Sequence, residues 1–309
     1  MPGLRTISGQ ALSRFSFGTM QFGAAANEAA SSEMYCACRE AGINFFDTAF
    51  LYAEGRSEEI AGRLVASERD DVFIATKCGY HGACRSRIEE EFGASRRRLD
   101  LESVDLLYLH RWDGETPLEE TFETLAGYRE DGSVRAFGVS NYAAWQVMKA
   151  REVARGFGVD VQFLQPMYNL VRRQVEVEIL PMATAEELAV CPYSPLGGGL
   201  LTGKYASGET GRLTTSDTYA TRYGFDWMHE AVANLVKIAD EVGAAPATLA
   251  VAWVARHPGV WGPIVSARST EQLAPSLAAI DFEIDDALHA RLSALSPAPP
   301  PATDRLEEA

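Results

Sequence analysis

The run Val104-Asp105-Leu106-Leu107-Tyr108-Leu109-His110 is short and almost entirely apolar before it ends in a histidine. Such a run is typical of a strand that is covered on both faces, as in a parallel sheet. Other runs along the chain share this character, being short and rich in Val, Ile, Leu or Phe. They are Phe15–Gly18, Phe45–Asp47, Val72–Lys77, Arg135–Ser140, Val161–Gln165, Ala189–Tyr193 and Gly262–Ser266. Together with Val104–His110 they predict eight buried strands.

Amphipathic segments lie between the strands, and two of them carry helix-start patterns. Thr116-Pro117-Leu118-Glu119 has the residues of a capping box, with proline at the first helical position. Ser86-Arg87-Ile88-Glu89 repeats the pattern and is followed by apolar residues at helical spacing. The sequence predicts that a helix begins at each of these points.

The spacing of the strands indicates the architecture. From Phe45 to Ala189 the strands start about every 26 to 32 residues, the length of one strand–helix unit. Eight such units predict an α/β fold, a single-domain (β/α)₈ TIM barrel. We assign residues 1–295 to the barrel, with Ile284–Leu295 as a closing helix, and residues 296–309 to a flexible tail.

Two features qualify this assignment. About 70 residues separate the seventh strand from the eighth, including Ser207–Asp217 and a predicted helix near Met228–Val242, which we interpret as a loop over the barrel mouth. An open doubly wound sheet is the alternative architecture, and it would require a glycine-rich fingerprint after the first strand. The residues at that point, Gly18-Thr19-Met20-Gln21-Phe22-Gly23, do not form one.

Composition excludes several classes of function. The chain has 309 residues and a formal charge of −15, so it would repel nucleic acid and anionic membranes. The long uncharged run Val242–Ala255 is shorter than a membrane span and contains Gly243 and Pro246. The first 20 residues lack the organisation of a signal peptide, and we expect a cytoplasmic protein.

The cysteines suggest no metal site or disulfide framework. There are five, an odd number, and none forms a C-x-x-C pair. We expect reduced thiols and assign no metal site. A redox role for Cys78 or Cys84 stays open because both lie close after Lys77.

Candidate catalytic side chains stand where predicted strands end. Asp47, Lys77 and His110 end three successive strands, and Tyr52 follows Asp47 by five residues. In a barrel, the carboxyl ends of the strands open onto one face, where active sites lie. We therefore expect these four side chains to converge, with Asp47 on the strand next to Lys77 as the partner of its ammonium group.

The chemistry of the four groups predicts carbonyl reduction. A tyrosine has a pKa near 10, and an ammonium group within hydrogen-bond reach favours its phenolate and lowers that pKa. Such a tyrosine can protonate a carbonyl oxygen, and a neutral His110 can orient the same oxygen. The hydride must come from a nicotinamide, because side chains cannot supply one. The alternative of a Schiff-base aldolase using Lys77 is opposed by Asp47, which favours the protonated amine.

Later strand ends offer groups that suit a dinucleotide. Asn141 and Gln165 have amides able to pair with a carboxamide, and Tyr193 has a ring face for stacking. Gly197-Gly198-Gly199 would let backbone N–H groups approach a pyrophosphate, with Lys204 nearby as a counter-charge.

The ordered motifs resemble those of the aldo-keto reductase family over roughly residues 4 to 290. The grouping is closer to the bacterial branch that includes the potassium-channel β-subunits than to the mammalian aldose reductases. The matching segments are Phe46–Ala49 with Tyr52, Gly55–Glu59, Ile74–Lys77, Asp105–Asp113, Gly138–Tyr142, Leu164–Leu170 and Pro192–Tyr205. The resemblance implies a (β/α)₈ barrel that binds NADPH without a Rossmann domain and reduces aldehydes and ketones to alcohols.

The resemblance also implies a role for each matching residue. Tyr52 takes the position of the proton donor, Lys77 and Asp47 its supporting pair, and His110 the position that orients the carbonyl. The implied cofactor contacts are Thr19, Met20, Asp47, Ser140, Asn141, Gln165, Tyr193, Ser194, Leu196, Gly198, Lys204, Arg268 and Gln272.

The adenosine end departs from the family pattern. Ser266 stands where relatives usually have Gly or Lys, and Pro275 and Ser276 replace the common Glu-Asn pair. Arg268 is the clear cation for a 2′-phosphate, although a solvated arginine at a helix start would look the same in the sequence. We expect NADP(H) rather than NAD(H).

The substrate and partner predictions are coarser. The loop after Lys77 is short, which suggests that the mouth of the barrel is open. We expect the substrate side of the mouth to be lined by aromatic residues, which favours apolar or aromatic carbonyl compounds. They are Tyr80, His81, Trp112, Phe22 and Phe50. A small-molecule carbonyl is the expected partner, and the sequence leaves a monomer or a homo-oligomer undecided. The alternative function is a cofactor-sensing regulatory or partner-binding subunit with little turnover.

Overall fold

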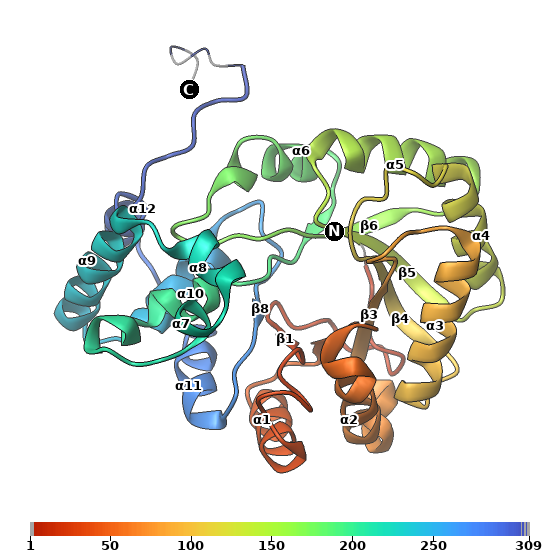
Figure 1. The fold of residues 1–309 in the computed structure, drawn as a ribbon, viewed down its shortest axis with the longest axis horizontal. Coiled ribbons are helices and arrows are strands. Elements are labelled where there is room, and N and C mark those ends of the chain that lie inside the picture. Colours follow the sequence, from red (N-terminus) through yellow and green to blue (C-terminus); the bar gives the residue numbers. More distant parts are fainter. Residues whose placement is uncertain (1–2, 304, 306, 308–309) are drawn as a thin grey trace.

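The computed structural model describes residues 3–303, 305 and 307. Within them, eight parallel strands form one curved sheet in the order β7-β6-β5-β4-β3-β2-β1-β8 (Figure 1). The strands are β1 (Ser16–Gly18), β2 (Phe45–Asp47), β3 (Phe73–Cys78), β4 (Val104–Leu109), β5 (Val134–Ser140), β6 (Val161–Gln165), β7 (Ala189–Val190) and β8 (Ile264–Val265). The predicted (β/α)₈ barrel is confirmed.

The ring closes between β7 and β8 without a regular ladder. The backbone N–H of Trp261 donates to the carbonyl of Val190, and that of Ile264 to the carbonyl of Pro192, each at 2.9 Å. Both strands are shorter than the predicted Ala189–Tyr193 and Gly262–Ser266. Prolines in both segments, at positions 192 and 263, lack the N–H that a ladder needs, which accounts for the shortening.

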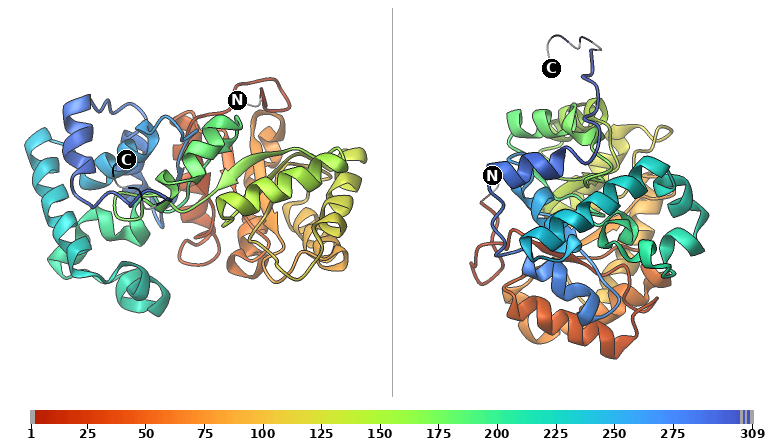
Figure 2. Two further views of the ribbon diagram at one scale, coloured as in Figure 1. Left: turned by 90° about the horizontal axis from the view of Figure 1, so that it is seen from above. Right: turned by 90° about the vertical axis from the view of Figure 1, so that its left-hand side faces the viewer.

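Helices surround the strands on the outside (Figures 1 and 2). The helices of the repeating units are α1 (Glu28–Glu40), α2 (Arg56–Val65), α3 (Arg85–Leu99), α4 (Leu118–Glu130), α5 (Ala144–Gly156), α6 (Ile179–Ala185), α10 (Pro246–Arg256) and α11 (Thr270–Ala278). Additional 3₁₀ turns occupy Tyr52–Gly55, Ala66–Asp71, Gln174–Glu176, Gly197–Thr202 and Lys204–Ser207.

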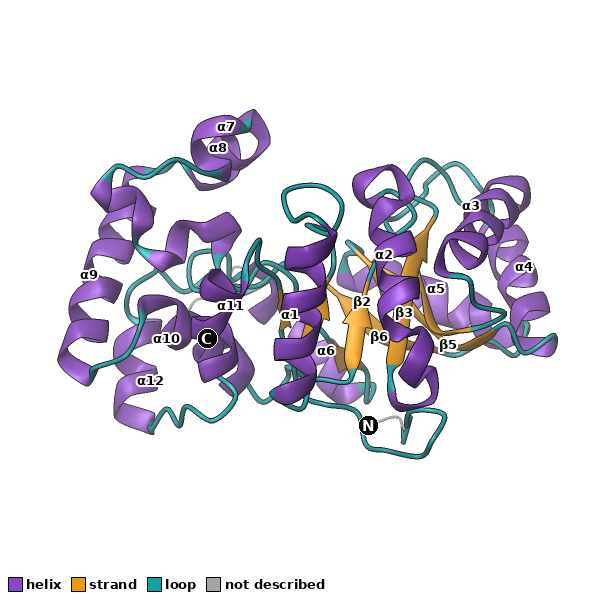
Figure 3. Ribbon diagram, turned by 90° about the horizontal axis from the view of Figure 1, so that it is seen from below, coloured by secondary structure: helices purple, strands orange, loops and turns teal. Residues whose placement is uncertain are grey.

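The long insertion and the chain end add further helices. They are α7 (Arg212–Thr215), α8 (Asp217–Tyr223), α9 (Asp226–Val242) and α12 (Asp286–Ser293). Figure 3 shows α7 and α8 at the end of the barrel towards which the strand arrows point, as expected for a loop over the mouth. Helix α12 lies within the predicted closing helix 284–295, and its Ser293 Oγ accepts a 2.9 Å hydrogen bond from Trp253. Residues 304, 306, 308 and 309 of the predicted tail lie outside the described residues.

Both predicted capping boxes are wrong in detail. Pro117 itself occupies the N-cap of α4, and the Thr116 hydroxyl instead donates to Asp113 at 2.6 Å. The N-cap of α3 is Cys84, so Ser86 lies inside that helix. Asp113 also accepts the backbone N–H of Ala83, which ties together the loops that follow β3 and β4.

Two apolar layers stabilise the barrel. The inner layer fills the ring with aromatic rings from several strands, such as Phe45 on β2, which lies 4.9 Å from Phe73 on β3 and 6.3 Å from Phe163 on β6 between centroids. The outer layer packs the other faces of the strands against the helices. Because both faces are buried, the strands read as continuous apolar runs, as the sequence predicts.

Among the described residues, no single helix has the length and apolar composition to cross a membrane. Helices α9 and α10 satisfy that test only as a pair, which is bent by 96°.

Candidate active site

A cavity of about 690 Å³ opens at the carboxyl ends of the strands, and we call it the mouth cavity. Its size lies within the usual range for a small-molecule site. Most of the predicted site residues line it, from the catalytic group to the adenosine end. They are Met20, Asp47, Tyr52, His110, Ser140, Asn141, Gln165, Tyr193, Ser194, Leu196, Gly198, Lys204, Arg268 and Gln272.

Lys77 lies behind the cavity wall, where neighbouring groups satisfy its ammonium. Strands β2 and β3 are adjacent, and Lys77 Nζ donates to the Asp47 carboxylate. It also donates to the Thr48 carbonyl at 2.7 Å and to the Tyr52 hydroxyl at 3.2 Å. Gln165 donates to the second Asp47 oxygen at 2.8 Å. A fully buried ion pair is tolerated only with such additional hydrogen bonds.

The protonation of this pair suits an acid rather than an amine nucleophile. Burial lowers the pKa of Lys77, but Asp47 and Tyr52 together outweigh it, so the pKa lies above its ordinary value. Burial raises the pKa of Tyr52, and Lys77 only partly opposes that rise. Lys77 lowers the pKa of Tyr52 as the sequence predicts, but desolvation outweighs the ammonium group, so the net shift is upward. At neutral pH Tyr52 holds its proton.

His110 is held neutral on the same wall. Burial, followed by the charges of Lys77 and Arg111, lowers its pKa to about 3. Its ring lies edge-on to Tyr52, with centroids 6.2 Å apart, and Tyr80 stands on another side at 5.1 Å. Among the described residues its buried Nδ1 has no hydrogen-bond partner. A neutral imidazole keeps one N–H that can donate to a ligand oxygen.

The side-chain amides predicted to bind a carboxamide already have hydrogen-bond partners on the cavity wall. Asn141 has a left-handed backbone with φ of 59°, and its amide donates to the His110 carbonyl at 2.9 Å. The Tyr193 hydroxyl donates to the Asn141 side-chain oxygen at 2.7 Å. The Ser140 hydroxyl donates to the backbone carbonyl of Gln165 at 2.9 Å. This network fixes the side chains on the wall, and their contact with a nicotinamide remains a prediction.

The far end of the mouth cavity fits an anionic dinucleotide. Burial and then the charge of Arg268 lower the pKa of Lys204, so the two cations lie within electrostatic reach of each other. Ser266 and Ser276 line the same end, and their buried hydroxyls have no partner among the described residues. Clustered cations and unpartnered donors are what phosphate oxygens satisfy.

The glycine triplet and the insertion form one side of this end. Gly197, Gly198 and Gly199 have φ values of 57°, 67° and 97°, which favour glycine. The ring of Tyr219 on α8 lies over the triplet, since a Cβ on Gly198 would be 2.5 Å from it. Arg212 and Arg222 lie 5.2 and 5.6 Å from that ring.

Three residues of the insertion belong to the site although the sequence did not indicate them. Arg212, Tyr219 and Arg222 line the mouth cavity together with Arg111 and Tyr80. The interruption in the strand spacing located the segment, but nothing in its pattern indicated which side chains would face inwards. Arg111 directly follows His110, and its guanidinium lies 4.9 Å from the centre of the Tyr80 ring.

Several predicted residues do not line the mouth cavity. Thr19 is fully buried, and its hydroxyl shares a 2.8 Å hydrogen bond with Ser57. Phe22 is 1% exposed and packs on Phe17, so its predicted contact with substrate is wrong.

Phe50, His81 and Trp112 are also absent from the lining. Phe50 stacks beneath Arg98, and Trp112 packs against Tyr142 and Trp145. Tyr80 remains on the wall. The predicted aromatic substrate surface is therefore not assembled as a group.

Cys78, which directly follows Lys77, lies in an environment that disfavours reaction of its thiol. Cys78 is buried, and burial raises the pKa of its thiol. Because the thiolate is the reactive form, this environment disfavours a redox role for Cys78. Cys84 is a free, partly exposed thiol at the start of α3.

Comparisons with known proteins agree with this geometry. A probable voltage-gated potassium channel subunit beta of Oryza sativa subsp. japonica is 35% identical over 292 residues, covering 89% of this chain and 89% of the relative. Aflatoxin B1 aldehyde reductase member 2 of Rattus norvegicus is 34% identical over 310 residues, covering 91% and 83%. The solved structure of a glycerol dehydrogenase from Gluconobacter oxydans superposes with a TM-score of 0.82 at 29% identity, covering 96% of this chain and 93% of that one. The model of the aldo/keto reductase family matches residues 14–297, and the chain therefore belongs to this family of oxidoreductases.

Proposed function

We propose that the protein reduces aldehyde or ketone carbonyls to alcohols with NADPH. The observation that carries the proposal is the hydrogen-bonded set in which Lys77, behind the wall of the mouth cavity, contacts Asp47 and Tyr52 on that wall, which also contains neutral His110. The cationic far end of the same cavity supports an anionic dinucleotide as cofactor. When bound, NADPH supplies the hydride that no side chain can provide.

Four side chains supply the proton and orient the carbonyl in the proposed reduction. Tyr52 holds a proton and gives it to the carbonyl oxygen as negative charge develops there, which completes the alcohol. Lys77 stabilises the phenolate that Tyr52 becomes, and Asp47 holds Lys77 in place. His110 donates a hydrogen bond to the carbonyl oxygen and sets its direction.

The two alternative functions have less support. A Schiff-base aldolase needs a neutral amine, whereas the Asp47 contact keeps Lys77 protonated. A regulatory subunit with little turnover is compatible with the likeness to the rice protein. A regulatory role does not explain why all four catalytic groups are brought together, so we favour the reductase.

The pH dependence follows from the two shifted groups. Reduction needs the protonated phenol, and the pKa of Tyr52 lies above its ordinary value near 10, so kcat should be constant from about pH 5 to pH 9 and fall only at about pH 10 or above as Tyr52 ionises. Alcohol oxidation needs the phenolate and should rise over the range where reduction falls. His110 should add no inflection, because its pKa of about 3 lies below this range. Initial rates in both directions against pH test this, and a fall in reduction between about pH 6 and 7 would contradict it.

Arg268 should determine the preference for NADPH. Replacing Arg268 by Ala should weaken NADPH binding about 10- to 100-fold, because a charge-assisted hydrogen bond to the 2′-phosphate is lost. NADH binding should change less than about threefold. Quenching of the five tryptophans on titration with each cofactor measures both values, and Arg97→Ala on the surface of α3 is the matched control. Equal weakening of NADPH and NADH would remove Arg268 from the phosphate site.

A further inference from the structure

The turn that carries Tyr52 is conformationally demanding. Ala53 and Glu54 have left-handed backbones with φ of 49° and 58°, and Gly55 follows with φ of 96°. This region is energetically unfavourable for a residue other than glycine. Consecutive residues of this kind persist only where the surrounding structure holds them. The position of the Tyr52 hydroxyl therefore depends on what fixes the turn from behind.

Arg98, on α3, contacts this turn at three points. Its guanidinium donates to the Phe50 carbonyl at 3.0 Å and lies 4.6 Å from the centre of the Phe50 ring. It also fills the space beside Gly55, where a Cβ would lie 2.3 Å from Arg98 Nε. The contacts thus lie on both sides of Tyr52 in the chain.

Glu58 on α2 holds the guanidinium in this position. Its side chain is 0% exposed, and one carboxylate oxygen accepts from Arg98 at 3.2 Å. The other oxygen accepts from the Thr76 hydroxyl at 2.7 Å. Thr76 precedes Lys77 on β3, so the link runs from the turn to the strand that carries the lysine.

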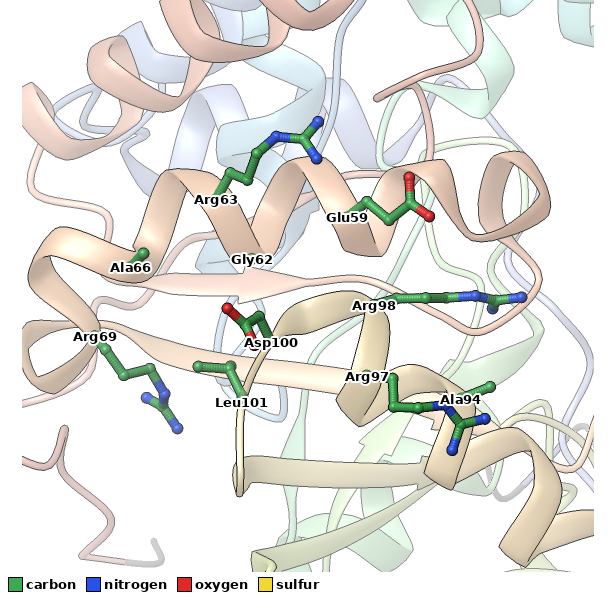
Figure 4. Close-up of a pocket in the computed structure, with 10 residues that line it drawn as sticks. All are labelled: Glu59, Gly62, Arg63, Ala66, Arg69, Ala94, Arg97, Arg98, Asp100 and Leu101. Carbon is green, nitrogen blue, oxygen red and sulfur yellow. The ribbon is translucent and has the colours of Figure 1, made fainter.

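Neighbouring Arg97 makes a useful contrast. Both arginines line a surface groove between α2 and α3, and Figure 4 shows their side chains leaving α3 in different directions. Arg97 is exposed, whereas the Arg98 side chain is only 26% exposed despite its charge. The low exposure of the Arg98 side chain shows that it is held by specific contacts and is not simply a solvated surface cation.

We infer that Arg98, held by the buried carboxylate of Glu58, is a positioning residue that fixes the Tyr52 hydroxyl against Lys77. Neither residue lines the mouth cavity, so both act through the turn and not by touching substrate. The inference rests on the proposed function only for its effect on turnover.

The test compares Arg98→Met and Glu58→Gln with Arg98→Lys and the control Arg97→Met. Arg98→Met should lower kcat for carbonyl reduction about 10- to 100-fold, because a small displacement of the proton donor is costly. The Kd for NADPH should change less than about twofold, and Arg98→Lys should recover only part of kcat, because an ammonium can still donate a hydrogen bond but cannot stack on the Phe50 ring as the guanidinium does. Amide hydrogen exchange across residues 49–55 should be faster in Arg98→Met than in Arg97→Met.

The outcomes of these experiments distinguish the positioning role of Arg98 from the proposed carbonyl reduction. Unchanged exchange at residues 49–55, or a kcat within about twofold of Arg97→Met, would overturn the positioning role. If the wild-type protein reduces no carbonyl but Arg98→Met still accelerates exchange at the turn, the proposed reaction fails and the positioning of Tyr52 stands. A loss of Tm alone, with kcat and exchange at the turn unchanged, would show that the link is only a packing contact.

Discussion

Replacing Tyr52 by Phe should lower kcat for carbonyl reduction about 10²- to 10⁴-fold, the contribution expected of a positioned general acid. The substitution removes only the hydroxyl that accepts from Lys77 at 3.2 Å and retains the ring on the cavity wall. The Kd for NADPH should therefore stay within about threefold of the wild-type value. Steady-state rates with an aldehyde panel and a fluorescence titration with NADPH measure the two effects.

The matched control for this variant is Tyr128→Phe, which removes a hydroxyl from a residue of α4 that does not line the mouth cavity. It should leave kcat unchanged. Retention of most of the turnover by Tyr52→Phe would exclude Tyr52 as the proton donor. A parallel loss of NADPH binding would show that the ring position, and not the proton, had been disturbed.

Replacing Lys77 by Met should reduce both activity and stability. The stabilising ammonium behind Tyr52 is lost, so kcat should fall about 10²-fold or more. Asp47 would keep a buried charge with only the Gln165 amide as a side-chain donor, which should lower the free energy of unfolding by about 3–5 kcal/mol. Rates and urea unfolding measure the two losses.

A double variant distinguishes the two contributions of this lysine. Combining Lys77→Met with Asp47→Asn removes the unpaired charge and should recover much of the stability without restoring activity. Recovery of turnover in the double variant would contradict a direct role of Lys77. Full stability in Lys77→Met alone would show that the pair contributes little to the fold.

The repeat in the sequence was sufficient to predict the fold. Strands buried on both faces give short apolar runs, and the titratable residues at their ends fall on one rim by geometry alone. Asp47, Lys77 and His110 illustrate this, because each lies within one residue of the end of β2, β3 or β4, and Tyr52 lies in the turn after β2. Local helix-start patterns were less reliable, since Asp113 competes for the Thr116 hydroxyl that the capping box would use.

The properties that could not be predicted depend on packing between distant segments. The direction of the Tyr52 pKa shift is the balance of desolvation against one ammonium group, and burial is not visible in sequence. Phe22 and Phe50 lie in the predicted mouth loops, but one is buried on Phe17 and the other beneath Arg98. The contact of Arg98 with the Tyr52 turn joins residues more than 40 positions apart in the sequence.

The most direct test of the proposed reaction follows a labelled hydride. The protein is incubated with an aldehyde and NADPH that carries deuterium at the nicotinamide carbon from which hydride leaves, and the alcohol is analysed by mass spectrometry. We expect one deuterium on the carbinol carbon of the product, with Tyr52→Phe forming it far more slowly. Alcohol without deuterium, or no alcohol from any aldehyde tested, would contradict hydride transfer to a carbonyl in this site.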